Sequence, residues 1–339
     1  MVRSFLRILG GAALILAPQA AAAGISLSPR AVIYFDNGEQ RQQGIDAFPI
    51  PTDALAGLND QIRALAGPDA ALSGAVGEGG GSARQIVFPM FGGSITVGGQ
   101  QTQVTFTGLY GTAETSSRIV VPLNLALTAG GFTATDLLST VAEGRATYRR
   151  IDLELTVQHR LDERFALIGG VRYERVRSRA TLDAITTSST NIANLVALLS
   201  GSGPVDLGLS QGEQRLDLGA VSESWSLRGG AAAFVPFARR QLVYVNGMVH
   251  VSRAPALTAQ ALLTDLDGGG TLDLSTRRPS ETSVGPDISV GILSRFSDRV
   301  ALDIRYRGIF YFPLSGVRGF DDPRVNHGLN LGLTFALGR

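Results

Sequence analysis

The 339-residue sequence contains no cysteine and no lysine. Without cysteine the chain cannot form disulfides, iron–sulfur clusters or a thiol nucleophile. All 30 basic residues are arginines, set against 29 acidic residues, so the net charge is only +1. A nucleic-acid-binding protein needs a basic excess to gather phosphates, and this balance argues against that class. Charged residues make up 17% of the chain, below the roughly 25% of soluble domains.

Past the N-terminus the sequence also lacks any run of about 18 apolar residues, which excludes a helical membrane span. The mean hydropathy is nevertheless positive, at +0.16. At the N-terminus, Arg3 and Arg7 flank the start of an apolar core that runs to Ala17, and a small-residue stretch follows it to Ala23. This order is typical of a secretory signal peptide. We therefore expect residues 1–23 to be a signal peptide and residues 24–339 to form one exported domain.

Strict alternation of apolar and polar residues dominates the rest of the chain. Along residues 150–158 every second residue is apolar, and after a polar turn at 161–164 the pattern resumes through 165–174. A period of two predicts strands with one apolar and one polar face. The same hairpin unit recurs near residues 225–251 and 288–307.

These strands are longer than the five or six residues usual in soluble proteins, and about 9–11 tilted residues cross a membrane. The expected strands span residues 27–36, 84–97, 101–112, 147–159, 165–178, 221–235, 241–253, 283–296, 299–312 and 327–338. Short connections alternate with long ones, and in transmembrane barrels the short turns face the periplasm. Because every backbone group must be paired in lipid, the sheet has to close on itself. We predict an all-β fold, namely a transmembrane antiparallel β-barrel of ten strands. Eight or twelve strands are the alternative counts. A secreted β-sandwich or lipocalin-like barrel is the alternative in which the protein is soluble.

The hairpins at Ile151–Tyr173 and Ile288–Tyr306 and the final strand at Leu329–Leu337, behind an export signal, resemble bacterial outer-membrane β-barrel proteins of the small surface-antigen or opacity-protein kind. The resemblance covers most of the chain and is one of pattern rather than of motif. It implies a monomer in the outer membrane, in contact with its lipid and lipopolysaccharide. It also implies the barrel-assembly machinery as a partner during biogenesis. Members usually end on an aromatic residue that this machinery recognises; here Phe335 lies four residues before Arg339.

The polar faces of the strands indicate what fills the barrel. Inward positions carry Arg150, Asp152, Glu154, Arg172, Glu174, Asp303, Arg305 and Arg307. Because strand 147–159 pairs with strand 165–178, Asp152 or Glu154 can meet Arg172, and the planar guanidinium suits such pairs. Eight strands leave room only for side chains, whereas wide channels need about 16 or more. We expect a largely closed, salt-bridged lumen, with a narrow ion or solute path as the alternative.

Four of the long loops hold short leucine-rich stretches at helical spacing. They are Leu55, Leu58, Ile62 and Leu65; Leu137, Leu138 and Val141; Ile192, Leu195, Val196 and Leu199; and Leu257, Ala261 and Leu262. We expect short amphipathic helices in the extracellular loops. They would pack on one another as a lid, lie on the outer leaflet or enclose an apolar ligand.

The loop from Asp265 to Asp273 resembles the start of an EF-hand calcium loop. The match places Asp265 and Asp267 at positions one and three, the Thr271 carbonyl at seven and Asp273 at nine. Two positions depart from the pattern: Gly269 at position five supplies no side-chain oxygen, and Thr276 stands at position twelve, where a bidentate Glu is expected. An Asp- and Gly-rich surface turn is the simpler interpretation, and calcium is the only cofactor that the sequence suggests.

His250 and Ser252 share one face of a strand, with Glu281 opening the neighbouring strand. The pair resembles the arrangement in outer-membrane lipid A deacylases, where a histidine activates a serine and a carboxylate orients the histidine. The rest of that motif is not recognisable, so we expect polar lumen residues rather than an enzyme.

Two classes of function follow from these patterns. A closed barrel that carries long loops is typical of an envelope structural or surface-interaction protein. A narrow or gated path would make the chain a transporter of a small, apolar solute. An esterase is the remote third hypothesis.

Overall fold

The computed structural model describes residues 24–36, 59–60, 62–76, 80–81, 86–188, 191–201, 203, 213–266, 271–273, 275–315 and 323–337. The expected signal peptide at residues 1–23 lies outside this part of the chain. No helix within the described ranges is long and apolar enough to cross a membrane.

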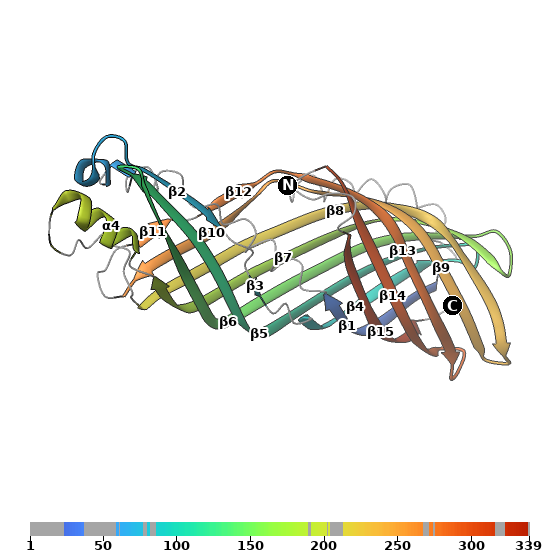
Figure 1. The fold of residues 1–339 in the computed structure, drawn as a ribbon. Helices are drawn as coiled ribbons and strands as arrows, with labels where there is room; N and C mark the ends of the chain where they lie inside the picture. Colours follow the sequence, from blue (N-terminus) through green and yellow to red (C-terminus); the bar gives the residue numbers. More distant parts are fainter. Residues whose placement is uncertain are drawn as a thin grey trace.

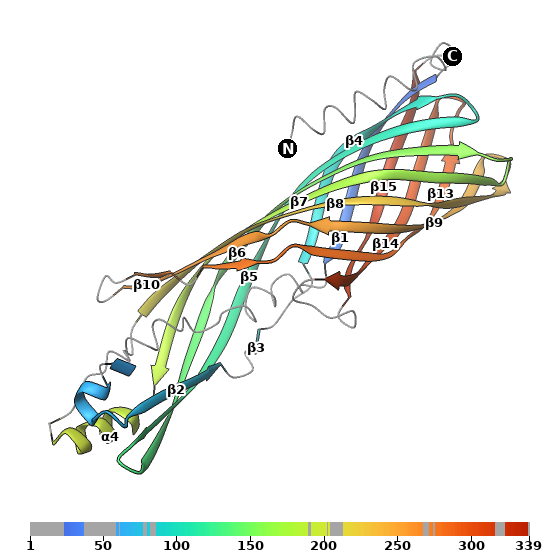
Figure 2. The same ribbon diagram turned by 90° about the horizontal axis from the view of Figure 1, so that it is seen from above.

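Ten antiparallel strands close into a ring (Figures 1 and 2). They are β1 (Gly24–Asp36), β4 (Ile86–Gly98), β5 (Thr102–Ala129), β6 (Phe132–Arg160), β7 (Phe165–Ser188), β8 (Glu213–Ala238), β9 (Gln241–Ala254), β13 (Glu281–Arg295), β14 (Val300–Ser315) and β15 (Arg324–Leu337). Each strand pairs with its neighbours in this order, and β1 pairs with β15 from Ile25↔Leu337 to Asp36↔Asn326. The expected ten-stranded antiparallel barrel is confirmed, with every expected strand inside an observed one or within two residues of it.

Four neighbouring strands continue far beyond the ring as an extended ribbon (Figure 2). β5, β6, β7 and β8 have 28, 29, 24 and 26 residues, whereas β14 has 16 and β9 has 14. Short strands line the ribbon: β2 (Ala71–Val76) and β3 (Gly80–Gly81) pair with β5, and β10 (Leu257–Asp265) pairs with β8. β11 (Thr271–Asp273) and β12 (Thr276–Arg278) pair with β10.

Two of the expected loop helices are strands instead. Residues 137–141 lie in β6 and residues 257–262 lie in β10. A spacing of three or four residues between leucines does not exclude a strand when threonines and other β-branched residues fill the positions between them, as they do along 133–141. In the ribbon, the neighbouring strand satisfies every backbone group that a helix would have satisfied internally.

The other two expected helices pack on each other at the distal end of the ribbon (Figure 1). α4 (Asn191–Ser200) buries Ile192, Leu195 and Val196 in a cluster that includes Ile62, from a helical segment at 62–66. The carboxylate of Asp136 on β6 accepts hydrogen bonds of 2.8 Å from the amides of Asn191 and Ile192. It therefore caps the N-terminus of α4, where an anion is favoured. Leu55 and Leu58 lie outside the described residues.

Large apolar side chains cover the outer face of the ring. They include Ile25, Leu27, Phe91, Ile95, Leu227, Val245, Val249, Ile292, Ile304, Tyr306 and Leu331, each more than a third exposed. Such a surface is unstable in water but stable against lipid tails, and closure leaves no unpaired edge. The chain is therefore a transmembrane β-barrel, with the short turns at 161–164, 239–240 and 296–299 at one end and the ribbon at the other.

Glycines on the inner face let the sheet bend into a narrow ring. An added Cβ would lie 2.2 Å from the Leu155 carbonyl oxygen at Gly170, and 2.0 Å from the Gly247 carbonyl oxygen at Gly230. Because the nearest atoms are backbone, nothing can move aside without opening the ladder. These positions permit the strong local curvature for which glycine is suited in strands.

Replacing Gly230 with Ala is expected to destabilise the barrel. The new methyl group would overlap the backbone of β9, and overpacking of this kind costs about 1–3 kcal/mol. Thermal unfolding in detergent, followed by loss of the compact band on gels, measures the change. Gly247→Ala is the matched control, because a Cβ there meets nothing within 4 Å. Equal unfolding temperatures for the two variants would contradict the curvature argument.

Candidate functional site: the barrel lumen

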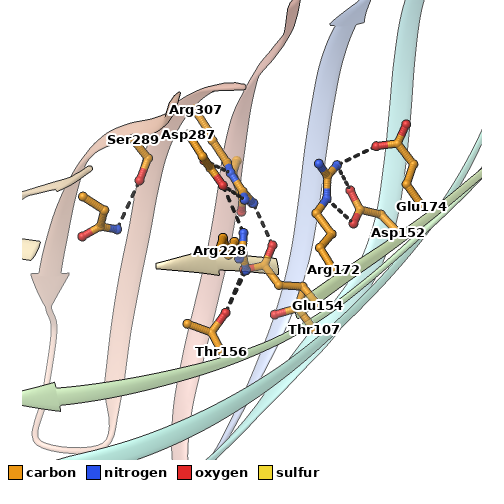
Figure 3. A network of polar contacts seen from close by, with 12 residues as sticks. Thr107, Asp152, Glu154, Thr156, Arg172, Glu174, Arg228, Asp287, Ser289 and Arg307 are labelled. Carbon is orange, nitrogen blue, oxygen red and sulfur yellow. Dashed lines mark hydrogen bonds and ion pairs between the residues drawn. The ribbon is translucent and has the colours of Figure 1, made fainter. Parts of the chain in front are cut away.

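Charged side chains cross the middle of the lumen in a network of ion pairs (Figure 3). Even-numbered residues of β6, β7, β8 and β9 and odd-numbered residues of β13 and β14 point inward, as the buried positions along these strands show. The network has three parts, which follow one another along the barrel axis from the ribbon end to the turn end.

The first part joins β6 and β7 near the ribbon end. Arg172 donates to Asp152 from Nε at 2.8 Å, and its Nη2 lies 2.9 Å from Glu174. Arg150 donates to the same Glu174 at 2.9 Å. All four side chains are at most 5% exposed. Arginine thus alternates with carboxylate, and each charge that the fold buries has an opposite charge within contact distance.

Aromatic rings fix the arginines of this first part. Arg172 donates from Nη1 to the Tyr311 hydroxyl at 2.8 Å, which connects β7 to β14 across the lumen. The Arg150 guanidinium stands 4.5 Å from the ring centre of Tyr34 on β1, and Arg324 stands 4.2 Å from that of Tyr311. Cations over aromatic faces are favourable, and more so when both are desolvated.

The second part joins four strands around Glu154 and Asp287. Arg307 on β14 donates to Asp287 from Nε at 2.7 Å and to Glu154 from Nη1 at 2.8 Å. Arg228 on β8 forms ion pairs with the same two carboxylates, at 3.1 Å for Asp287. It also donates to the Thr156 hydroxyl at 2.9 Å. Since Glu154 lies on β6 and Arg307 on β14, these contacts bridge opposite walls of the barrel.

The third part lies nearest the short turns. Asp303 on β14 is 3.5 Å from Arg30 of β1 and accepts a short hydrogen bond from the Tyr244 hydroxyl of β9. Arg305 faces the same region but makes no ion pair with any described carboxylate. The Nε atoms of Arg30 and Arg305 are buried without a hydrogen-bond partner.

Between the first part and the ribbon, an apolar cluster fills the lumen. Tyr34, Phe88, Met90, Leu109 and Tyr148 are at most 6% exposed and pack together from β1, β4, β5 and β6. The Phe88 and Tyr148 rings meet edge to face, with centroids 5.9 Å apart. The first two parts of the ionic network and this cluster together occupy the ribbon half of the interior.

Of the charged lumen residues expected from the sequence, all except Arg305 form ion pairs among the described residues. The structure adds Arg30, Arg228, Asp287 and Arg324, which the sequence analysis did not single out. The alternation of outward and inward residues along a strand would have predicted two of these four residues, Arg228 and Asp287, to face the lumen. Arg228 follows the outward Leu227, and Asp287 precedes the outward Ile288, so each belongs to the inward set of its strand.

The hydrolase arrangement of His250, Ser252 and Glu281 is not assembled. Both ring nitrogens of His250 are buried and have no hydrogen-bond partner within the described part of the chain, so Ser252 does not bond to the imidazole. His250 lies opposite Gly285, whereas Glu281 pairs with Ala254, four residues along the ladder and roughly 13 Å away. The His250 ring instead packs against Tyr311 at a centroid distance of 4.7 Å.

The calcium loop is largely a β-hairpin. Thr271 pairs with Thr264 and Asp273 pairs with Leu262, so both lie in β11 rather than in an ion-wrapping loop. The Ser275 hydroxyl and the Ser275 amide, the latter at 2.8 Å, both donate to the Asp273 carboxylate, and these two bonds hold the pKa of the exposed carboxyl below its usual value. Asp267 and Gly268–Gly270 lie outside the described residues. Within the described residues, no group of three or more His, Cys, Asp or Glu side chains could hold a metal ion.

Comparison with known proteins gives no relative by sequence: no family model and no curated protein matches the chain. Among solved structures, the chain is similar to an outer-membrane protease, OmpT of Escherichia coli, at 10% identity and a TM-score of 0.37, over 93% of this chain and 96% of that one. It is also similar to the COG4313 outer membrane channel of Pseudomonas putida F1, at 10% identity and a TM-score of 0.31, over 94% and 97%. The Pseudomonas putida toluene transporter TodX gives 12% identity and a TM-score of 0.28, over 96% and 93%.

These likenesses are too distant to bear on activity. The class of the protein follows from its own closed antiparallel ring, its apolar outer face and its buried polar interior, which are the features of bacterial outer-membrane barrels. The chain is an outer-membrane β-barrel protein.

Replacing Asp152 with Asn is expected to lower the free energy of unfolding by about 3–5 kcal/mol, because it leaves the buried Arg172 without its bidentate partner. The exposed pair Asp183–Arg215, 3.5 Å apart in the ribbon, supplies the control. Asp183→Asn should cost no more than about 1 kcal/mol. Urea unfolding in lipid vesicles, followed by fluorescence of the single tryptophan, Trp225, measures both. Equal losses would show that the lumen network does not stabilise the barrel.

Proposed function

We propose that this protein is a surface-interaction protein, in which a closed barrel anchors a long extracellular β-ribbon. The observation that carries the proposal is the ribbon itself. β5 pairs with β4 only as far as Gly111, yet it continues to Ala129. At about 3.3 Å per residue, residues 112–129 extend roughly 60 Å beyond that last pair. A transport function requires no such projection.

The closed interior supports the same proposal. Four arginines and four carboxylates of the network, together with the apolar cluster around Phe88 and Met90, fill the ribbon half of the lumen. Moving these paired charges apart would expose each one to an interior with little water, at a cost of several kcal/mol per ion. This filling favours an anchor over a general pore, and we expect the protein to act as a monomer.

The outer surface supports contact with lipopolysaccharide. Arg149, Arg175, Arg177 and Arg179 point outward from β6 and β7 just beyond the apolar outer face, and Arg149 pairs with Arg177 in register. Like charges opposite each other are unfavourable unless anions lie between them. Phosphates of the outer leaflet would supply these anions, because guanidinium groups bind them in bidentate fashion.

Purified protein in planar bilayers is expected to show no stable openings of the size that a porin gives. The physical reason is that ion pairs and apolar side chains fill the ribbon half of the lumen. A general porin reconstituted in the same bilayer is the positive control. Stable openings of comparable conductance would overturn the closed-barrel proposal in favour of a transporter.

Deleting the tip of the ribbon tests the interaction role. Residues 115–146 are replaced with an Asn-Gly turn between Glu114 and Thr147, which are partners in the β5–β6 ladder. We expect the shortened barrel to assemble and remain heat-modifiable, because the ring pairs at residues 102–111 are retained. We expect cells that express the full-length protein to aggregate with one another, and cells that express the shortened protein not to. Aggregation by the shortened protein at the full-length level would contradict the proposal.

A further inference from the structure

The turn-end half of the lumen is hollow, unlike the ribbon half. A cavity of about 540 Å³ begins at the turn that contains Ser297 and Arg299 and ends at Glu154 and Arg307. Cavities of roughly 300–1,000 Å³ are typical of small-molecule sites. Because short turns face the periplasm, the cavity is a blind vestibule that opens toward the periplasm.

One wall of the vestibule carries an uncompensated positive charge. Arg30 and Arg305 both line the cavity, and Asp303 is the carboxylate between them. Glu154, the other carboxylate at the inner end, is already bound by Arg228 and Arg307. Arg305 therefore keeps guanidinium donors that no described carboxylate accepts, and its Nε is buried without a partner.

Two glycines direct the neighbours of Asp303 onto it. Arg30 on β1 pairs with Gly332 on β15, which pairs in turn with Asp303, so the Arg30 side chain crosses β15 where no side chain blocks it. Tyr244 reaches Asp303 from the other side across Gly291, where an added Cβ would lie 2.5 Å from its ring. Asp303 is thus held from both sides, and Arg305 is left facing the cavity.

The opposite wall of the vestibule is apolar. Ile168, Phe234, Leu242 and Met248 line it from β7, β8 and β9 and belong to one packed cluster, and Leu293 continues it on β13 beside Asp303, its partner in the β13–β14 ladder. At the rim, the Arg160 guanidinium stands 5.4 Å from the ring centre of Phe234. A ligand that satisfies both walls has one anionic head group and a short apolar body.

We propose that the vestibule binds an amphipathic monocarboxylate from the periplasmic side, with its carboxylate on Arg305 and Arg30 and its alkyl chain against the Phe234–Leu242 wall. Within the group of Arg30, Asp303 and Arg305, two arginines face one carboxylate, so a single negative charge on the ligand balances that group. The bidentate fork of arginine suits a carboxylate. This role goes beyond surface interaction and needs no passage through the barrel.

Isothermal titration of the full-length barrel in lipid nanodiscs with octanoate tests the proposal. We expect one saturable site for octanoate, with octanol and acetate each at least about tenfold weaker, because each offers only one of the two features. Equal binding of octanol would overturn the role of the charge, and equal binding of acetate would overturn that of the apolar wall. Octyl phosphate is the fourth compound, and binding about tenfold tighter than octanoate would overturn the choice of a carboxylate head.

Substitutions distinguish binding of octanoate in the vestibule from non-specific attraction of octanoate to exposed arginines. Arg305→Gln should weaken octanoate by about tenfold or more, whereas Arg305→Lys, which keeps the charge but loses the bidentate fork, should weaken it by less than Arg305→Gln does. Arg239→Gln is the matched control, since Arg239 is exposed in a turn at the same end and does not line the cavity. Heat-modifiable mobility checks that each variant is folded. Unchanged affinity in Arg305→Gln, or an equal loss in Arg239→Gln, would overturn the assignment.

Discussion

The ladder between β1 and β15 is the constraint on which the rest of the structure depends. In hydrocarbon, an unpaired backbone group has no water to bond, so a sheet is stable there only when its first and last strands meet. Pairing from Ile25↔Leu337 to Asp36↔Asn326 completes the ring. Once the ring is closed, one set of alternate residues must face lipid and the other set must fill a narrow interior. Both the apolar outer face and the charged lumen follow from this division.

Filling a narrow interior with charge requires that the charges be paired and that their side chains have room. Arginine meets the first requirement because one guanidinium contacts two carboxylates at once, as Arg307 and Arg228 do with Glu154 and Asp287. Glycine meets the second, since the inward Gly291 and Gly332 leave space for Tyr244 and Arg30 to lie across a neighbouring strand. These arginine–carboxylate pairs fill the ribbon half of the lumen. In the turn-end half, Asp303 is the carboxylate between Arg30 and Arg305, so the cavity there keeps an excess of positive charge.

The sequence predicted the ring well, because burial on one face and lipid on the other impose a strict period of two. It therefore predicted the number of strands, the pairing of β6 with β7 and the charged residues that face the lumen. The ribbon was missed because, beyond the membrane, neither face of a strand must be apolar and the period fades. For this reason the leucine spacing at residues 137–141 predicted a helix, although these residues lie in β6. Contacts across the lumen, such as Arg172 with Tyr311 or Arg307 with Glu154, join strands far apart in sequence. The alternation pattern within a single strand cannot predict such contacts.

The continuity of β5 and β6 from the turn end to the ribbon tip also has a mechanical consequence. Their ladder runs unbroken from Thr102↔His159 to Ala129↔Phe132. A load applied at the tip along the strand direction pulls β5 and β6 together, so it would shear the hydrogen bonds that join β6 to β7, from Leu138↔Ser188 to Arg160↔Ala166, at the same moment rather than peel them one after another. A cell tethered through this ribbon would transmit tension directly into the wall of the membrane anchor, with no hinge in between to absorb it.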